Sequence, residues 1–324
     1  MQPSRWRQTN AAFTDRRNAE HTFITRIGPA LIDAEDHGLL TAWFFLRKQQ
    51  WRFRWLPTSP EAADTIIRML TDADRSVTWT SVVCEFEPLA FGGPSGLSAA
   101  CEFFHADSQH LLRRLATDRP LGQRETSVLL CSALLRGAGL DWFEQGDVWS
   151  RVIDLRATHQ PAIPADTGKA RDLHDATRTL LTADAHGLCD LAQDGPLSCH
   201  QEWITAFEQT GRTLARLNDT GQLERGLRAV LAHHLIFHFN RAGLTGIDQA
   251  TLAALAINVI FHERRQMFTT TGAPADDAEW SGPAHDMVAW DDAPHRRAAW
   301  RSVPNPLLLI LRRLLGAVPP APPS

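Results

Sequence analysis

The chain has 324 residues, of which 44% are hydrophobic and 22% charged, a composition typical of an ordinary globular protein. Its formal net charge of −4 argues against a general nucleic-acid-binding protein. Tyrosine is absent, which excludes a phenolic acid or base and leaves histidine, carboxylates, serine, arginine or water for proton transfer.

The cysteines and the apolar segments indicate the cellular compartment in which the protein is expected. The five cysteines form no CxxC pair, so we interpret them as reduced thiols. The first thirty residues contain five arginines and no continuous apolar run, unlike a secretory signal peptide. The most apolar segment, Leu307–Leu315, contains two arginines and is much shorter than the roughly twenty residues of a membrane span. We therefore expect a cytoplasmic protein.

The first clear element in chain order is a β-hairpin over Trp43–Trp55, where bulky and basic residues alternate on both sides of Gln49 and Gln50. In its second strand, Arg52 and Arg54 share one face. These two guanidiniums either form a fixed set of donors for carboxylates and carbonyls, or coat a solvated face of the sheet. The alternation alone does not decide between the two alternatives.

Helices and one further strand follow the hairpin. Ser59–Pro60 predicts the N-cap and first position of a helix, because serine accepts a backbone hydrogen bond there and proline fits the first turn. Residues Val77–Glu87 alternate like a third strand, and Phe91–Pro94 is predicted as a turn. In the helix after this turn, Ser108 falls on the apolar stripe and is predicted to face inward.

The rest of the chain is predicted to be helical, and the fold class is α+β, helix-rich with a small antiparallel sheet near the N-terminus. A polar, proline-containing stretch at residues 158–168 is the best linker candidate. It divides the chain into a sheet-containing half at 1–157 and a helical half at 169–317, or it lies within one continuous domain. Residues 270–294 are predicted as a loop and 318–324 as a disordered tail. The predicted helices are Arg124–Leu135, Trp142–Leu155, Ala170–Leu181, Trp203–Leu217, Leu223–Arg241 and Asp248–Phe268.

Two groups of polar residues could carry chemistry. His234 and His238 have the four-residue spacing of a metal site, but no third ligand follows, so we expect core or cavity histidines and no metal. His105, Asp107 and Ser108 lie in the middle of a predicted helix, without the exposed turn and oxyanion hole that a nucleophilic serine needs. Hydrogen-bonded helix packing is the predicted role of this second group.

Four stretches of the sequence resemble the thiopeptide-type bacteriocin biosynthesis proteins, which are similar to the glutamate-elimination domain of lantibiotic dehydratases. The resemblance implies that fold, and an enzyme that acts on a precursor peptide with a leader, azoles and dehydroalanines. It implies no cofactor and no nucleic-acid or membrane partner, and leaves the oligomeric state open. The four stretches are Trp43–Trp55, Cys84–Ser108, Arg124–Arg151 and Arg225–Leu244.

One departure from the wider family concerns the residue before Phe91–Gly93. Lantibiotic dehydratases carry an arginine there that helps to eliminate glutamate from activated serine, whereas this sequence has Ala90. The departure favours the pyridine synthases, which join two dehydroalanines by a formal four-plus-two aza-cycloaddition. That reaction closes the macrocycle and then loses water and the leader peptide to leave a pyridine. A stand-alone glutamate-elimination lyase and a non-catalytic partner that binds the leader peptide are the alternatives.

Within this resemblance we assign expected roles to individual residues. His238, with Asn240 or Arg241 nearby, is expected to move protons, and His234 is a second candidate. Arg52 and Arg54 are expected to hold or polarise the reacting amide carbonyl, and Arg16 and Arg17 to bind the acidic leader. The expected substrate contacts, with the aromatic rings stacking on thiazoles, are Trp43, Trp51, Phe91, Ser108, Arg124, Asn240 and Arg241.

Overall fold

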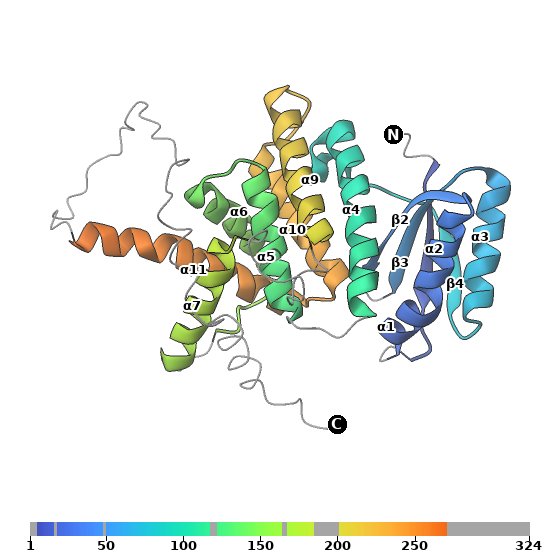
Figure 1. Cartoon of the computed structure of the whole chain (residues 1–324), viewed down its shortest axis with the longest axis horizontal. Coiled ribbons are helices and arrows are strands. Elements are labelled where there is room, and N and C mark those ends of the chain that lie inside the picture. Colours follow the sequence, from blue (N-terminus) through green and yellow to red (C-terminus); the bar gives the residue numbers. More distant parts are fainter. Residues whose placement is uncertain are drawn as a thin grey trace.

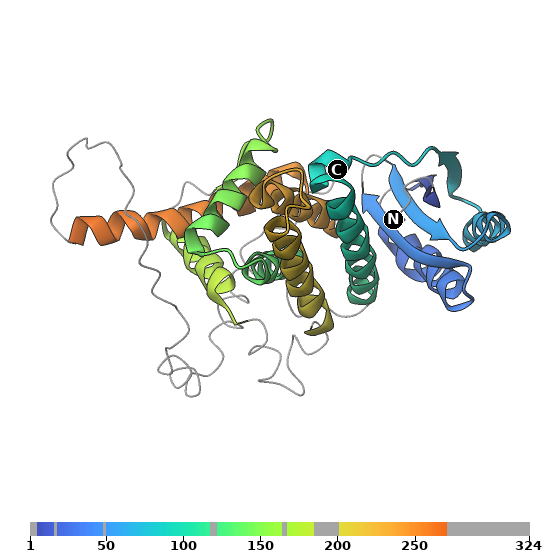
Figure 2. The same ribbon diagram turned by 90° about the horizontal axis from the view of Figure 1, so that it is seen from above.

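The computed structural model describes residues 5–15, 18–47, 50–116, 122–163, 167–184 and 201–270, with the side chains of the last helix described as far as Phe261. A small sheet with its own helices lies at one end of the molecule, and helix α4 stands between this sheet and the remaining helices in both views (Figures 1 and 2). Several expectations lie outside the described residues: Arg16, Arg17, Cys189, Cys199, the loop after residue 270, the apolar segment 307–315 and the tail 318–324.

Four antiparallel strands form the sheet, in the order β2-β3-β1-β4. Strands β2 (Leu40–Arg47) and β3 (Trp51–Pro57) form the predicted hairpin. Strand β4 (Thr78–Val82) is the predicted third strand, but it is shorter than expected and ends before Glu87. The prediction missed β1 (Arg7–Ala12), whose polar sequence lacks a run of β-branched residues and is held as a strand by pairing with β3 and β4.

Helices at the N-terminal end cover one face of the sheet. They are α1 (Ala19–Thr22), the π-helical turn η2 (Phe23–Ile27), α2 (Gly28–Asp36) and α3 (Pro60–Ala73). The ring of Phe23 lies 4.5 Å from that of Phe45 and 5.3 Å from that of Trp51, between ring centroids. The predicted cap of α3 is confirmed, because the Ala62 N–H donates a hydrogen bond to Ser59 Oγ at 3.1 Å.

Helix α4 (Gly93–Leu115) covers the outer edge of strand β2. The Phe45 N–H donates to Ser108 Oγ at 3.4 Å, and His105 Nδ1 lies within 3.2 Å of the backbone nitrogen and oxygen of Trp43. Ser108 is fully buried, which confirms that it faces inward. The two side chains thus provide hydrogen-bond partners for an edge strand that would otherwise expose unpaired backbone groups.

The remaining helices form the larger layer. Among the described residues their positions match the predicted helices, although the predicted helix at Leu223–Arg241 begins four residues later. Helices before the predicted linker pack on helices after it, as α5 does on α9 and α6 on α11, and the division into two halves stays a prediction. None of the described helices is long and apolar enough to cross a membrane. The helices are α5 (Gln123–Gly137), α6 (Trp142–Asp154), α7 (Thr167–Thr182), α9 (Gln201–Asp219), α10 (Leu227–Ala242) and α11 (Gly246–Thr270).

Candidate functional site

Helix α10 carries polar residues on two of its sides. His234, His238 and Arg241 are 0% exposed and pack into the interior. One position earlier in each case, His233, Phe237 and Asn240 line a cavity. Each set has the spacing of four and then three residues that places side chains on one helical face. The two faces of α10 therefore have to be considered separately.

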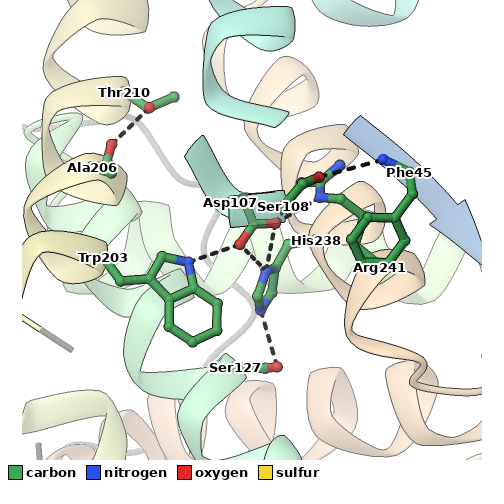
Figure 3. A network of polar contacts seen from close by, with 9 residues as sticks. All are labelled: Phe45, Asp107, Ser108, Ser127, Trp203, Ala206, Thr210, His238 and Arg241. Atoms are coloured by element: carbon green, nitrogen blue, oxygen red, sulfur yellow. Dashed lines mark hydrogen bonds and ion pairs between the residues drawn. The ribbon is translucent and has the colours of Figure 1, made fainter. Parts of the chain in front are cut away.

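On the interior face, the Asp107 carboxylate is the centre of a buried polar network (Figure 3). Arg241 Nε donates to it at 2.7 Å and Trp203 Nε1 at 2.8 Å. His238 Nδ1 lies 3.0 Å from the same carboxylate, and its Nε2 lies 3.0 Å from Ser127 Oγ. These five residues come from α4, α5, α9 and α10, so the network ties four helices together.

The charges in this network favour an ionised carboxylate. Burial acts to raise the pKa of the Asp107 carboxyl, but the charges and hydrogen bonds of His238 and Arg241 outweigh it and lower the pKa to about 2. Burial also lowers the pKa of Arg241, against the attraction of Asp107. A buried ion pair that is broken on one side is strongly destabilising. His238 and Arg241 thus link α10 to Asp107 in the interior, and neither side chain has exposed surface.

His234 lies in an aromatic part of the same interior. Its ring is 5.4 Å from that of Phe91 and 5.6 Å from that of Phe103, between centroids. Its Nδ1 is 2.9 Å from the Val230 carbonyl oxygen, and its Nε2 has no hydrogen-bond partner among the described residues. Burial lowers the pKa of His234 to about 4, so the imidazole is neutral near pH 7.

On the other face of α10 lies a cavity of about 320 Å³, which we call the His233 cavity. It is bounded by the C-terminal end of α6, by α10 and by the residue before the short 3₁₀ turn η3 (Pro88–Phe91). Its volume is at the lower end of the range for small-ligand sites. The lining residues combine apolar side chains with an acid, an arginine, a histidine and an amide: Glu87, Leu155, Arg156, His233, Ile236, Phe237 and Asn240.

His233 has the properties of a general base. In the tautomer with the proton on Nδ1, this proton is donated to the Ala229 carbonyl oxygen at 3.1 Å and Nε2 is the acceptor. In the other tautomer, Nδ1 accepts from Arg225 Nη1 at 3.4 Å. Burial lowers the pKa of His233, and the nearby charges of Arg225 and Arg156 lower it further. A neutral imidazole with its Nδ1 proton fixed can accept a proton from a substrate at near-neutral pH.

A chain of hydrogen bonds fixes the amide side of the cavity. Arg156 Nε donates to Gln249 Oε1 at 2.7 Å, and Gln249 Nε2 donates to Asn240 Oδ1 at 3.0 Å. Gln249 itself is buried on α11. Because its carbonyl oxygen is engaged, Asn240 is oriented with its amide N–H groups as the donors that remain for a ligand.

The structure places the predicted arginine pair outside the lining of this cavity. Arg54 is only 8% exposed, so the alternative of a solvated sheet face is wrong for this residue. Arg54 Nε donates to Gln8 Oε1 and its Nη2 to the Glu85 carbonyl oxygen, both at 2.8 Å. Arg54 therefore fixes the segment that carries Glu87 into the cavity. Arg52 is next to it on the same face and partly exposed.

The other predicted contacts fall in different places. Trp43, Phe91 and Ser108 are core residues, so a contact with substrate would require the helices to separate. Trp51 lines a second cavity, described below, that shares Asn240 with the first. Arg124 forms an ion pair with Asp248, at 2.5 Å between Nη2 and Oδ1.

Three polar residues of the His233 cavity were not predicted as site residues from the sequence: Glu87, Arg156 and His233. No role was assigned to His233, because the sequence does not tell which face of an apolar helix is covered. Glu87 and Arg156 lie just outside regular elements, where no periodic signal marks them. Among the described residues no group of three or more histidine, cysteine or acidic side chains could hold a metal ion.

A family model described as lantibiotic biosynthesis dehydratase C-term matches residues 6–260 of the sequence. The chain belongs to this family. Comparison with curated proteins finds no match. The resemblance to the elimination domain of lantibiotic dehydratases is thus confirmed at the level of the family.

Two solved structures share the fold of this lantibiotic dehydratase C-terminal family member. One is the tRNA-dependent lantibiotic dehydratase MibB from Microbispora sp. 107891, with a TM-score of 0.61 and 16% identity over 82% of this chain. The chain spans only 29% of MibB. The other is TbtD, a pyridine synthase from thiomuracin biosynthesis, with a TM-score of 0.54 and 13% identity over 80% of this chain and 98% of TbtD. At these identities the matches establish the helix-rich fold with a small antiparallel sheet.

Proposed function

We propose that the chain is a pyridine synthase that acts on a precursor peptide carrying a leader, azoles and dehydroalanines. The observation that carries this proposal is the His233 cavity, which holds a neutral histidine, an oriented amide and an arginine. These groups can move protons and hold a carbonyl, and the cavity lining contains neither a serine nor a cysteine nucleophile. Such a set suits a reaction that depends on proton transfer and orientation.

The roles of the residues follow from the steps of the family reaction. The reacting backbone amide has to lose its N–H proton and gain one on oxygen to become the iminol, and His233 Nε2 is the proposed proton carrier. Asn240 and Arg156 are the proposed donors to the carbonyl oxygen. Ile236 and Phe237 provide an apolar wall against which the two alkenes can be held together. Orientation of this kind is worth about 7–11 kcal/mol in well-aligned intramolecular reactions.

The residues expected from the sequence keep a role in the proposal, but most of them act indirectly, by positioning other residues. His238 and Arg241 position α10 through Asp107, and Arg54 positions Glu87. Arg52 is the more exposed member of the pair and is proposed to contact substrate at the entrance. Unchanged turnover in Arg52→Ala would remove that assignment.

Arg16 and Arg17 stay the proposed site for the acidic leader. The test is the double substitution of both arginines by alanine and measurement of leader affinity. We expect weaker binding, and an unchanged affinity would move the leader site elsewhere. A cytoplasmic location is also part of the proposal.

A second candidate function is the elimination of glutamate from glutamylated serine. Arg225 Nη1 lies 3.5 Å from the Ala90 carbonyl oxygen and 3.4 Å from His233 Nδ1. A guanidinium is therefore present near the position where lantibiotic dehydratases carry their arginine. Arg225 could bind a glutamyl carboxylate in place of that residue.

Mass spectrometry of the purified protein decides between these functions. The protein is incubated, without added metal or nucleotide, with a leader-bearing peptide that contains azoles and two dehydroalanines. We expect a macrocyclic pyridine and released leader. An untouched peptide, together with loss of glutamate from a glutamylated serine peptide, would instead establish the elimination lyase. If both peptides survive but the leader binds, the protein is a non-catalytic partner.

A further inference from the structure

A second and larger cavity, of about 560 Å³, lies on the other side of Asn240, and we call it the Arg47 cavity. It is formed where the β2–β3 hairpin and the start of α1 approach the turn between α10 and α11. Nothing in the proposed reaction uses this cavity apart from Asn240, which lines both. Its lining residues are Ala19, Glu20, Arg47, Trp51, Asn240, Gly243, Leu244 and Thr245.

Arg47 is held in a defined position in this cavity. Its guanidinium carbon lies 4.7 Å from the centroid of the Trp51 ring, and its Nη1 lies 2.5 Å from Glu20 Oε2. The Arg47 side chain is only 14% exposed. Stacking on tryptophan together with an ion pair keeps a guanidinium in one orientation.

The turn after α10 is shaped around this guanidinium. Gly243 has a φ of +77°, and a Cβ atom built there would lie 2.9 Å from Arg47 Nη1. A residue with a side chain would be strained in this conformation and would displace Arg47. Glycine at this position therefore lets the arginine approach the backbone closely.

The lining indicates the chemistry of a ligand. Arg47 supplies donors and Glu20 an acceptor, but as an ion pair they carry no net charge, so the cavity does not select for an anion. Asn240 adds amide donors, and Trp51 and Leu244 add apolar surface. The Thr245 hydroxyl already donates to Asp248 Oδ2 at 2.8 Å, so it is not one of the groups that a ligand would contact. Donors and acceptors side by side, without net charge, match the alternating N–H and C=O groups of a peptide main chain.

We propose that the Arg47 cavity is a second subsite, which binds an uncharged main-chain segment of the same peptide whose reacting part occupies the His233 cavity. Asn240 stands in the wall of both cavities, so a peptide passing this residue reaches from one to the other. The connection to the reacting segment rests on the proposed function, whereas the binding of peptide by the Arg47 cavity does not.

Calorimetric titration of the full chain tests the subsite. The probe is the leader-bearing azole peptide with serines in place of both dehydroalanines, which cannot cyclise. We expect Glu20→Gln and Arg47→Gln each to weaken binding about tenfold, because each removes hydrogen bonds to a charged group. Arg26→Gln is the matched control. Arg26 lies on the neighbouring turn η2, outside the cavity, and its Nη1 pairs with Asp74 Oδ2 at 3.1 Å.

The outcomes separate this inference from the proposed function. Binding within twofold of the unsubstituted protein in both cavity variants, or no binding of the probe at all, would overturn the subsite. Weakened binding in these variants with no turnover of the reactive peptide would leave the subsite in place and overturn the synthase. Urea unfolding of Glu20→Gln checks that the protein has not lost stability. This substitution keeps the shape of a half-exposed side chain, so we expect the free energy of unfolding to stay the same.

Discussion

Each of the two faces of α10 begins with a histidine and ends with another polar residue at the same spacing, but only one of them lines the His233 cavity. His234, His238 and Arg241 lie among large side chains, His238 and Arg241 contact the Asp107 carboxylate, and all three are 0% exposed. His233, Phe237 and Asn240 meet the end of α6, which leaves a cavity. The comparison shows that residue type alone does not decide whether a histidine can contact a ligand. The element that packs over that face of the helix decides it.

The interior face should be the more sensitive to loss of a charge. Asp107→Asn leaves Arg241 buried without its carboxylate, so we expect the free energy of unfolding to fall by about 3–5 kcal/mol. The measurement is equilibrium unfolding in urea. Asp147→Asn serves as the control: Asp147 pairs with the partly exposed Arg151 and Arg228, and its loss should cost less than about 1 kcal/mol. Equal effects of the two substitutions would contradict a structural role for the Asp107 network.

The pH dependence of stability sharpens the same contrast. In the folded protein the pKa of His234 is about 4, whereas an unfolded histidine titrates near 6.5. As the pH falls from about 6.5 to 4, the unfolded state takes up a proton that the folded state does not. The free energy of unfolding should therefore decrease over this window, by roughly 3 kcal/mol for such a gap.

The variant His234→Phe should flatten this pH dependence, because a phenyl ring fits the surrounding aromatic side chains and does not titrate. Some slope will remain, since the pKa values of His110 and His233 are also lowered by burial. Protonation of Asp107 lowers the free energy of unfolding further, but only between about pH 4 and 2. The measurement is urea unfolding at several pH values, and an unchanged slope in His234→Phe would contradict the assignment.

The smallest of these effects concerns the edge of the sheet. Ser108→Ala removes the hydroxyl that accepts from the Phe45 N–H and should lower the free energy of unfolding by about 1 kcal/mol. Turnover should not change, because Ser108 is fully buried and touches neither cavity. A loss of turnover at unchanged stability would restore Ser108 as a substrate contact.

Much of the fold follows from local patterns in the sequence. The hairpin, the cap at Ser59 and most of the helices were predicted, because each rests on alternation, spacing or a capping residue within a short window. Strand β1 was not predicted, because its pairing with β3 and β4 depends on residues forty or more positions away. The burial of Arg54 was missed for a similar reason, since its partners Gln8 and Glu85 are remote in sequence.

The candidate site was less predictable than the fold. The sequence selected helix α10 and included Asn240, and it named His238 as the proton carrier, whereas the histidine that lines the His233 cavity is His233. Residues 227–242 are apolar on nearly all sides, so no hydrophobic stripe marks the inner face of α10. The two histidines are distinguished by the elements that pack around the helix, which include α4, α5, α6 and α9.

The most direct test of this account is to compare His233→Gln with His238→Gln for both turnover and unfolding in urea. We predict that His233→Gln lowers turnover by about 10²–10⁴-fold and leaves the free energy of unfolding within about 1 kcal/mol. His238→Gln should mainly reduce stability, because it disrupts the contacts with Asp107 and Ser127. If instead His238→Gln abolishes turnover in a protein of normal stability while His233→Gln stays active, the division of α10 into a structural and a functional face is wrong.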